Sequence, residues 1–395
     1  MPTLQTAPPA GARAAFHLLA KPTGAICNLD CKYCFFLSKE MLYPGSRFRM
    51  ADDLLETYIK QLLESQIGSE VAIGWQGGEP TLMGLEFFER SIEYVKRHAK
   101  PGQRVSYTIQ TNGTKLNDEW CAFLKQHHVL VGLSIDGPKG LHDFYRVDKG
   151  GKGSYDDVIR GWECLRKHGV DVNILCTVNA ANGDSGAEVY RFFRDVLKTE
   201  FIQFIPIVEL APSGTEVTER SVGSEQWGRF MIDVFEEWVK RDVGKVYVQM
   251  FDAALASWVG APQSMCIFNE TCGGALALEH NGDLYSCDHF VEPKHLLGNI
   301  EKVHMLTLVT SEQQRRFGLA KRDTLPAYCR NCDVKFACHG ECPKNRFLTT
   351  PDGEPGLNYL CAGYKSFFTH IDRPMRLMAD LLRQGRYADE AMAML

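Results

Sequence analysis

The stretch Cys27-Asn28-Leu29-Asp30-Cys31-Lys32-Tyr33-Cys34 places three cysteines at C-x3-C-x2-C spacing, just after a short apolar run over residues 16–20. Three thiolates on so short a loop can converge on one face of an iron–sulfur cube. Such clusters usually take four cysteines, so three ligands leave one iron open to bind another molecule. Zinc with a later His or Cys as fourth ligand is the alternative. The aromatic residues Tyr33, Phe35 and Phe36 favour the cluster.

Composition and charge describe an ordinary globular chain of 395 residues with a formal net charge of −5. This charge argues against a general nucleic-acid binder. Because no stretch approaches the ~20 apolar residues that span a bilayer, we expect no membrane segment. Residues 1–15 read as a disordered leader rather than a signal peptide. We therefore expect a cytoplasmic protein, whose fourteen cysteines are mostly ligands and not disulfides.

Strand and helix patterns alternate between residue 16 and about residue 240. Strands are expected over 16–21, 71–75, 105–109, 129–135, 170–178 and 201–207, and helices over 52–65, 85–98, 118–128, 155–168, 186–197 and 224–240. Such alternation implies a parallel sheet with right-handed crossovers. Six strand–helix units fit a partial barrel better than a closed barrel of eight. Residues 241–265 are expected to form a linker.

Four polar loops follow the first four expected strands. These loops span residues 27–34, 76–80, 110–113 and 134–137. Because the carboxyl ends of parallel strands meet at one edge of a sheet, we expect the loops to share one rim. Cys121, Cys164 and Cys176 stand alone on apolar faces and are expected to be small core residues.

A second cysteine-rich region begins near residue 266. Its eight cysteines are Cys266, Cys272, Cys287, Cys329, Cys332, Cys338, Cys342 and Cys361. Two short strands around Asn281-Gly282 predict a β-hairpin within this region. Eight cysteines divide into two sites of four ligands, and C-x2-C followed by a later pair is also typical of zinc ribbons. Spacing alone does not decide which cysteines belong together.

These motifs together resemble the radical S-adenosylmethionine (SAM) superfamily and, within it, the anaerobic sulfatase-maturating enzymes. The segments that carry the resemblance are CNLDCKYC, WQGGEPTLMGLEFF, QTNGT, VGLSIDGP, FIQFIP, DLYSCDHF and CRNCDVKFACHGECP. They lie between residue 16 and about residue 368 and cover most of the chain. The resemblance implies an α/β fold: a partial (β/α)6 radical SAM barrel over 16–240, a SPASM domain over 266–363 and C-terminal helices over 364–395.

The resemblance also implies ligands for three [4Fe–4S] clusters. Cys27, Cys31 and Cys34 would hold the cluster whose open iron binds SAM. The first auxiliary cluster would take Cys266, Cys272, Cys287 and Cys342, and the second Cys329, Cys332, Cys338 and Cys361. With four protein ligands each, the auxiliary clusters would pass electrons rather than bind SAM.

Contacts to SAM and substrate follow from the same resemblance. The implied SAM contacts are Tyr33, Gly77, Gly78, Glu79, Ser134 and Arg146, and Gln76 would contact the substrate backbone. A surface ion pair for Arg146 and a buried structural amide for Gln76 stay open as alternatives. Relatives carry an acid at the position of Asp288 that is proposed as the catalytic base, whereas some have Tyr where this chain has Phe36.

The implied function is oxidation of a Cys or Ser in an unfolded sulfatase segment, Cys/Ser-x-Pro-x-Arg, to Cα-formylglycine. A 5′-deoxyadenosyl radical would abstract the hydrogen, and a small electron donor such as flavodoxin or ferredoxin would be a partner. No nucleic acid and no membrane are expected as partners. The alternatives are another SPASM peptide-modifying enzyme, for example one that forms thioethers, and a non-enzymatic zinc-binding adaptor.

Overall fold

The structure is a computed structural model that describes residues 14–211, 214 and 216–395. The expected leader over residues 1–15 lies, up to residue 13, outside the described residues. The chain divides into two compact units. Among the described residues, unit 1 contains 14–133, 147–171 and 272–320, and unit 2 contains 134–146, 172–271 and 321–395. No described helix combines the length and the apolar character needed to cross a membrane.

Parallel strands form the centre of unit 1. They are β1 (His17–Lys21), β2 (Glu70–Trp75), β3 (Arg104–Thr111) and β4 (Val129–Ser134). The hairpin predicted around Asn281-Gly282 is present as antiparallel β8 (Ala275–Glu279) and β9 (Asp283–Tyr285), followed by β10 (Leu296–Asn299). Strand β8 pairs in parallel with the free edge of β1, giving the order β10-β9-β8-β1-β2-β3-β4. The cysteine-rich region thus extends the sheet that carries the three-cysteine loop.

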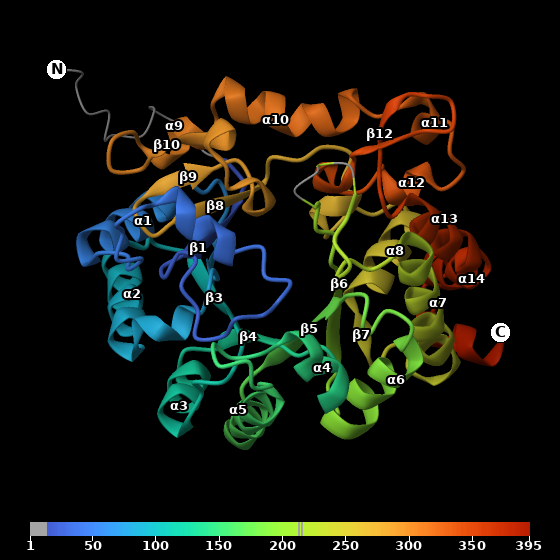
Figure 1. The fold of residues 1–395 in the computed structure, drawn as a ribbon, viewed down its shortest axis with the longest axis horizontal. Helices are drawn as coiled ribbons and strands as arrows, with labels where there is room; N and C mark the ends of the chain where they lie inside the picture. The colour runs from blue at the N-terminus through green and yellow to red at the C-terminus, as the bar shows by residue number, and fades with distance from the viewer. Residues whose placement is uncertain (1–13, 212–213, 215) are drawn as a thin grey trace. The chain divides into compact units, whose positions relative to one another are not determined.

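Helices cover one side of these strands (Figure 1). They are α1 (Asp52–Ser65), α2 (Leu85–His98), α3 (Asp118–Gln126) and α5 (Tyr155–His168), with α9 (Met305–Val309) and α10 (Glu312–Asp323) later in the chain. Aromatic side chains pack in the core. The ring centroid of Trp75 on β2 lies 5.7 Å from that of Tyr58 on α1 and 5.4 Å from that of Phe87 on α2. Helix α5 ends at Gly169, which adopts a left-handed φ of 64° that favours glycine.

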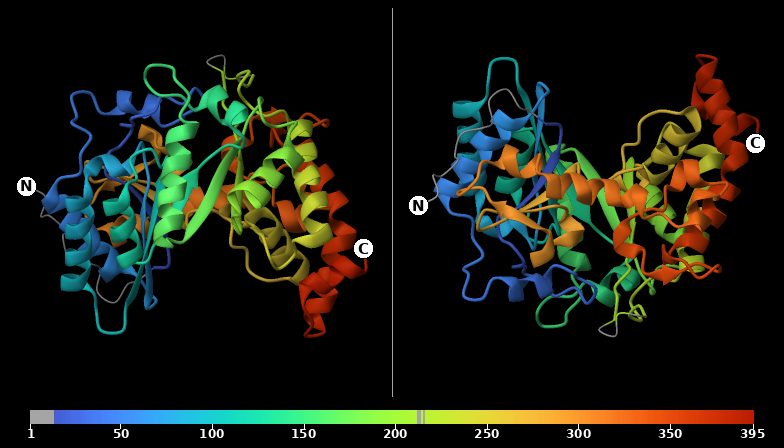
Figure 2. Two further views of the ribbon diagram at one scale, coloured as in Figure 1. Left: turned by 90° about the horizontal axis from the view of Figure 1, so that it is seen from below. Right: turned by 90° about the horizontal axis from the view of Figure 1, so that it is seen from above.

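Unit 2 contains the remaining parallel strands. They are β5 (Val172–Val178), β6 (Phe201–Pro206) and the short β7 (Tyr247–Val248). Its principal helices are α4 (Lys139–Tyr145), α6 (Gly186–Arg191), α7 (Ser224–Arg241), α8 (Gln249–Val259), α13 (Cys361–His370) and α14 (Asp372–Arg383). Helix α6 continues as a π-helical turn over Phe192–Leu197. Figure 2 shows the red α13 and α14 beside the yellow-green α7 and yellow α8.

A pair of glycines lets α13 approach α7 closely. A Cβ added at Gly228 would lie 2.8 Å from Cα of Gly363, and one added at Gly363 would lie 2.1 Å from the carbonyl oxygen of Ser224. The backbone N–H of Gly363 donates to Ser224 Oγ at 3.2 Å. This contact fixes the first turn of α13, which begins with Cys361.

Two sequence-based expectations for unit 2 were wrong. Residues 241–265, expected to be a linker, contain β7 and α8, and α8 buries Phe251 and Ala253 completely. The C-terminal helices were expected from residue 364, whereas α13 begins at Cys361 and is separated from α14 at Ile371. In both places the buried face is decided by neighbouring helices, which a local apolar pattern does not specify.

Candidate functional site

The three-cysteine loop follows β1, and the polar residues after β3 support it. Asn112 Nδ2 lies 3.6 Å from Cys27 Sγ, and the N–H of Leu29 lies 3.4 Å from the same sulfur. All three cysteines are partly buried. Burial, with smaller contributions from the nearby Glu79 and Cys34, raises the pKa of the Cys27 thiol to about 11. The structure therefore brings Cys27 and Cys34 together on a loop that retains some exposure.

The Gly77-Gly78 turn packs its backbone against the start of this loop. The N–H of Gly78 donates to the carbonyl of Gly24 at 2.8 Å, and the N–H of Glu79 donates to that of Ile26 at 2.9 Å. A Cβ at Gly78 would lie 2.0 Å from the Ile26 oxygen, and Gly77 has a φ of 125°. Only glycines allow this approach, so the turn is built together with the three-cysteine loop.

Glu79 ties the second and third loops together. Its fully buried carboxylate accepts hydrogen bonds from Thr81 Oγ1 at 2.6 Å, Thr111 Oγ1 at 2.7 Å and the N–H of Asn112 at 2.8 Å. Burial raises the pKa of Glu79, against the lowering effect of these donors. Since both oxygens accept from the protein, the geometry supports a role in holding the loop backbone. The predicted direct contact of Glu79 with SAM stays a prediction.

Two other predicted contact residues lie on the same loops. The backbone N–H of Gln76 donates to the carbonyl of Ala20 at 2.9 Å, and its side chain is half-buried. Tyr33, between the second and third cysteines, is buried. Both positions agree with loops at the carboxyl ends of β1 and β2, while their contacts to ligand and substrate stay predictions.

Asp288 lies beside the residues that follow the third cysteine. It begins a short 3-10 turn (Asp288–Phe290) after β9. The neighbouring His289 ring makes an edge contact with Phe35, with centroids 6.1 Å apart. Asp288 Oδ1 lies 2.5 Å from Nζ of Lys21, whose ammonium sits 4.1 Å from the centroid of Phe36. Thus unit 1 brings the predicted base next to Phe35 and Phe36, more than 250 residues away in sequence.

The sequence reasoning missed Lys21, although it stands at the end of an apolar strand where a lysine is unusual. Its side chain is completely buried. Glu279 Oε1 on β8 lies 3.8 Å from its Nζ as a second acidic neighbour. A charged residue directly before Pro22 and the cysteine motif is the signal that could have drawn attention to it.

In unit 2, Arg146 belongs to a buried hydrogen-bonded group. Its Nε lies 2.9 Å from Asp136 Oδ2, and Asp136 Oδ1 accepts from Thr177 Oγ1 at 2.8 Å. His142 Nδ1 accepts from the N–H of Asp136 at 3.3 Å, and burial lowers the pKa of His142 to about 3. The ion-pair alternative for Arg146 is therefore present, but in the interior and not on the surface. Ser134 is also buried.

Four of the later cysteines line one cavity in unit 2: Cys329, Cys332, Cys338 and Cys361. Burial raises the pKa of Cys338 to about 12 and that of Cys361 to about 11, with Cys329 adding to both. The short helices α11 (Ala327–Arg330) and α12 (Lys335–Cys338) and the start of α13 supply Cys329, Cys338 and Cys361, and Cys332 lies in the loop between α11 and α12. Four convergent thiols are the donor set of an iron–sulfur cluster or a zinc ion.

The other four later cysteines divide between the two units, with Cys272 and Cys287 in unit 1 and Cys266 and Cys342 in unit 2. In unit 1, Gln314 Nε2 donates to the carbonyls of Gly273 and Ser286, at 3.0 and 3.1 Å, next to Cys272 and Cys287. In unit 2, Lys321 Nζ donates to the carbonyl of Cys266 at 2.9 Å, and Cys342 is buried. Their grouping as one ligand set stays a prediction.

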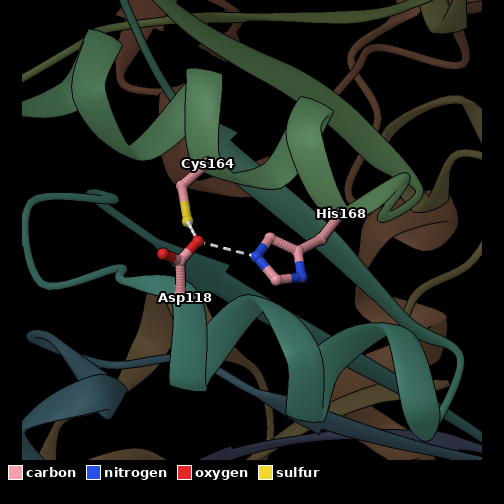
Figure 3. Close-up of side chains that lie close together, drawn as sticks. All are labelled: Asp118, Cys164 and His168. Carbon is pink, nitrogen blue, oxygen red and sulfur yellow. Dashed lines mark hydrogen bonds and ion pairs between the residues drawn. The ribbon is translucent and has the colours of Figure 1, made fainter.

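A further group of possible metal ligands joins α3 and α5 (Figure 3). Asp118 Oδ1 lies 2.7 Å from His168 Nε2 and 3.6 Å from Cys164 Sγ. Cys164 is only partly buried, unlike the core residue expected, whereas Cys121 and Cys176 are buried as expected. Lys167 Nζ occupies the same carboxylate oxygen at 2.8 Å and, with His168, lowers the pKa of Asp118 to about 2. A cation of the protein thus stands where a metal would bind, and we interpret the group as an ion-pair network.

Comparison with known proteins decides the family. The family model of the radical SAM superfamily matches residues 22–193, and that of the SPASM iron-sulfur cluster-binding domain matches 266–333. The chain is 44% identical to a serine-type anaerobic sulfatase-maturating enzyme of Bacteroides thetaiotaomicron, over 92% of this chain and 91% of the relative. This chain belongs to the anaerobic sulfatase-maturating enzymes. A cysteine-type member from Clostridium perfringens is 32% identical, over 89% of this chain and 95% of the relative.

Solved structures agree with this family assignment. Native anSMEcpe with bound AdoMet and Cp18Cys peptide matches with a TM-score of 0.84 and 31% identity, over 93% of this chain and 99% of that chain. Streptococcus suis SuiB bound to S-adenosylmethionine matches at a TM-score of 0.62 and 16% identity, over 88% and 77% of the two chains, which shows a common fold only. The predicted α/β fold, a radical SAM domain followed by a SPASM domain, is confirmed.

As an anaerobic sulfatase-maturating enzyme, the chain is a radical SAM oxidoreductase, and membership implies iron–sulfur clusters and SAM. The described residues fit these groups. Three cysteines on a glycine-supported loop suit a cluster with an open iron, and the set of four thiols in one cavity suits a fully ligated one. Membership in an enzyme family argues against the zinc-adaptor alternative.

Proposed function

We propose that this enzyme oxidises a Cys or Ser of an unfolded sulfatase segment to Cα-formylglycine. One observation carries the proposal: unit 1 holds the Asp288 carboxylate beside Phe35 and Phe36, directly after the three-cysteine loop. A proton acceptor is thereby placed next to the loop that would hold SAM. The family membership and the peptide-bound relative support a polypeptide substrate.

Three [4Fe–4S] clusters are proposed. Cys27, Cys31 and Cys34 would hold the first cluster. The cavity residues Cys329, Cys332, Cys338 and Cys361 would hold the second, and Cys266, Cys272, Cys287 and Cys342 the third. When bound, SAM and the clusters supply a radical that abstracts hydrogen and an acceptor for one electron. The protein's own part is to hold the loops in place through Glu79 and the Gly77-Gly78 turn.

Asp288 acts as the general base in this proposal. A serine side chain loses two hydrogens when it becomes an aldehyde, one from the β-carbon as a hydrogen atom and one from the hydroxyl as a proton. The carboxylate of Asp288 accepts that proton, and the remaining electron leaves the substrate. Proton transfer needs only hydrogen-bond reach and an ionised carboxylate. A cysteine reacts in the same way to a thioaldehyde, which water hydrolyses to the aldehyde with release of hydrogen sulfide.

The proposed substrate is a Cys/Ser-x-Pro-x-Arg segment in extended form, with Gln76 contacting its backbone. Identity is higher to the serine-type relative from Bacteroides, at 44%, than to the cysteine-type relative from Clostridium, at 32%. We therefore expect a serine peptide to be turned over. A flavodoxin or ferredoxin is the proposed electron donor.

The test is anaerobic incubation of the reconstituted enzyme with SAM, reductant and matched Ser and Cys peptides. Mass spectrometry should show a loss of about 2 Da from the serine peptide, or about 18 Da from the cysteine peptide, as the proposed oxidation requires. Asp288→Asn should still release deoxyadenosine but form little formylglycine. Glu292→Gln, a partly exposed acid four residues further along, is the matched control and should behave as wild type. Formylglycine formation by Asp288→Asn at the wild-type level would reject the base assignment.

A further inference from the structure

We infer that Lys21 is a positioning residue that fixes the carboxylate of Asp288 beside the three-cysteine loop, an inference that rests on the proposed function. Lysines are almost never fully buried unless they are paired. Lys21 is completely buried, and its closest acidic partner is Asp288, with Nζ and Oδ1 2.5 Å apart. Removing an ammonium from water is costly, so the fold keeps this charge only while an acidic partner stays in place.

Lys21 and Asp288 are buried to different degrees, and this difference decides which of the two side chains can reach a substrate. The side chain of Lys21 is 0% exposed, whereas that of Asp288 retains 15%. Glu279, the second acidic neighbour, is 3% exposed and lies farther away, at 3.8 Å. Asp288 is thus the partner that can also meet a substrate, while Lys21 holds it from the interior.

Lys21 also joins three separate segments of unit 1. Its ammonium lies over the ring of Phe36, 4.1 Å from the centroid, in a cation–π contact with the segment that follows Cys34. A Cβ added at Gly77 would lie 3.2 Å from Cβ of Lys21, so the stem of the lysine packs against the glycine turn. Its head meets Asp288 on the turn after β9.

Loss of the Lys21 ammonium should affect the yields of formylglycine and deoxyadenosine differently. Without the ammonium, Asp288 loses its fixed partner while the three cysteines and the glycine turn remain. Hydrogen abstraction from the peptide should continue, but proton removal should fail. Lys21→Met should therefore lower the yield of formylglycine per deoxyadenosine, and Lys21→Arg should restore part of it because the cation is kept.

The experiment is a double-mutant cycle on reconstituted holoenzyme with Lys21→Met, Asp288→Asn and the combined variant, in which formylglycine and deoxyadenosine are both quantified. We expect Lys21→Met to lower formylglycine formation by about tenfold or more but deoxyadenosine release by less than about threefold. In the Asp288→Asn background the same change should have no further effect, since coupled residues are non-additive. Iron content and SAM binding serve as structural readouts and should stay at wild-type levels.

Two results would overturn the inference: a wild-type product ratio in Lys21→Met, or effects of the two single changes that multiply in the combined variant. If Lys21→Met does not fold, Lys21→Gln combined with Glu279→Gln removes one cation and one anion together, and the same product ratio is measured. Wild-type enzyme that converts neither peptide would instead reject the proposed function, because this measurement involves no change at Lys21.

Discussion

The three-cysteine loop of unit 1 and the four-cysteine cavity of unit 2 both present cysteine thiols, but they present them in different ways. The loop presents three partly buried cysteines from one short segment after a strand. The cavity gathers four thiols from three separate segments, of which Cys329 is buried and the other three are partly buried, and burial raises the pKa of Cys338 to about 12. Metal sites that bind a second molecule keep a position open, whereas structural ones are closed. The number of convergent thiols, and not their burial, therefore distinguishes the two sites.

The contacts that hold the three-cysteine loop in place also differ from those that hold the four-cysteine cavity. Hydrogen bonds from neighbouring loops hold the three-cysteine loop, through Asn112 and the Gly77-Gly78 turn. Helix packing holds the cavity, through the contact of Gly228 with Gly363. We therefore expect the three-thiol loop to leave a ligand position for SAM and the four-thiol cavity to leave none. The following predictions test this difference.

The largest effect is expected from Cys34→Ala. With two cysteines left, the loop can no longer hold a cluster that binds SAM. Deoxyadenosine release, followed by chromatography under reducing anaerobic conditions, should fall on the order of a thousandfold or more, since the catalysed cleavage depends on this group. Release close to the wild-type rate would show that the open iron lies elsewhere.

Cys338→Ala should distinguish the role of the cavity from that of the three-cysteine loop. The cavity loses one of four ligands, so about four irons per chain should be lost, as for one cube. Deoxyadenosine release should remain within about threefold of wild type, while formylglycine formation is lost. Cys164→Ser is the matched control, and its iron content should be unchanged. Equal loss of both products in Cys338→Ala would contradict the division into an open site and a closed one.

Glu79→Gln should loosen the three-cysteine loop without removing a ligand. The amide of glutamine offers one acceptor oxygen where the carboxylate accepts on both, and its NH2 faces the N–H of Asn112 or the hydroxyls of Thr81 and Thr111. Leaving such a buried donor unpaired should destabilise unit 1 by about 1–3 kcal/mol, measured as a lower unfolding midpoint. Glu93→Gln, at an exposed position on α2, is the control. An unchanged midpoint would mean that Glu79 does not tie the loops together.

The smallest effect concerns His142 of unit 2. Burial lowers its folded-state pKa to about 3, while an unfolded histidine titrates near 6.5. Between these values the unfolded chain binds the extra proton, so stability falls as the pH drops below about 6.5, by at most ~1.4 kcal/mol per pH unit. His142→Gln should flatten this slope in thermal unfolding between pH 7 and 5. A variant that keeps the wild-type slope would assign the pH dependence to another group.

Most elements of the fold could be predicted because their signals are local. The bounds of α1, α2 and α5 agree with the apolar spacing, since each helix buries one continuous stripe. The hairpin of β8 and β9 was predictable from Asn281-Gly282. The pairing of β8 with β1 was not predicted, because no local pattern specifies which edge of a sheet a hairpin joins. Helix α8 was missed for a related reason, since neighbouring elements decide what it buries.

The sequence by itself indicated a three-thiol site, because the spacing of Cys27, Cys31 and Cys34 is set by a few covalently linked residues. It also indicated the strand ends at which polar loops gather. Only the tertiary structure decided the encounters between distant side chains. Lys21 meets Asp288, and Cys361 joins Cys329, because packed strands and helices bring their segments together. The free energy of such contacts comes from burial shared by many residues, and no short stretch of sequence contains it.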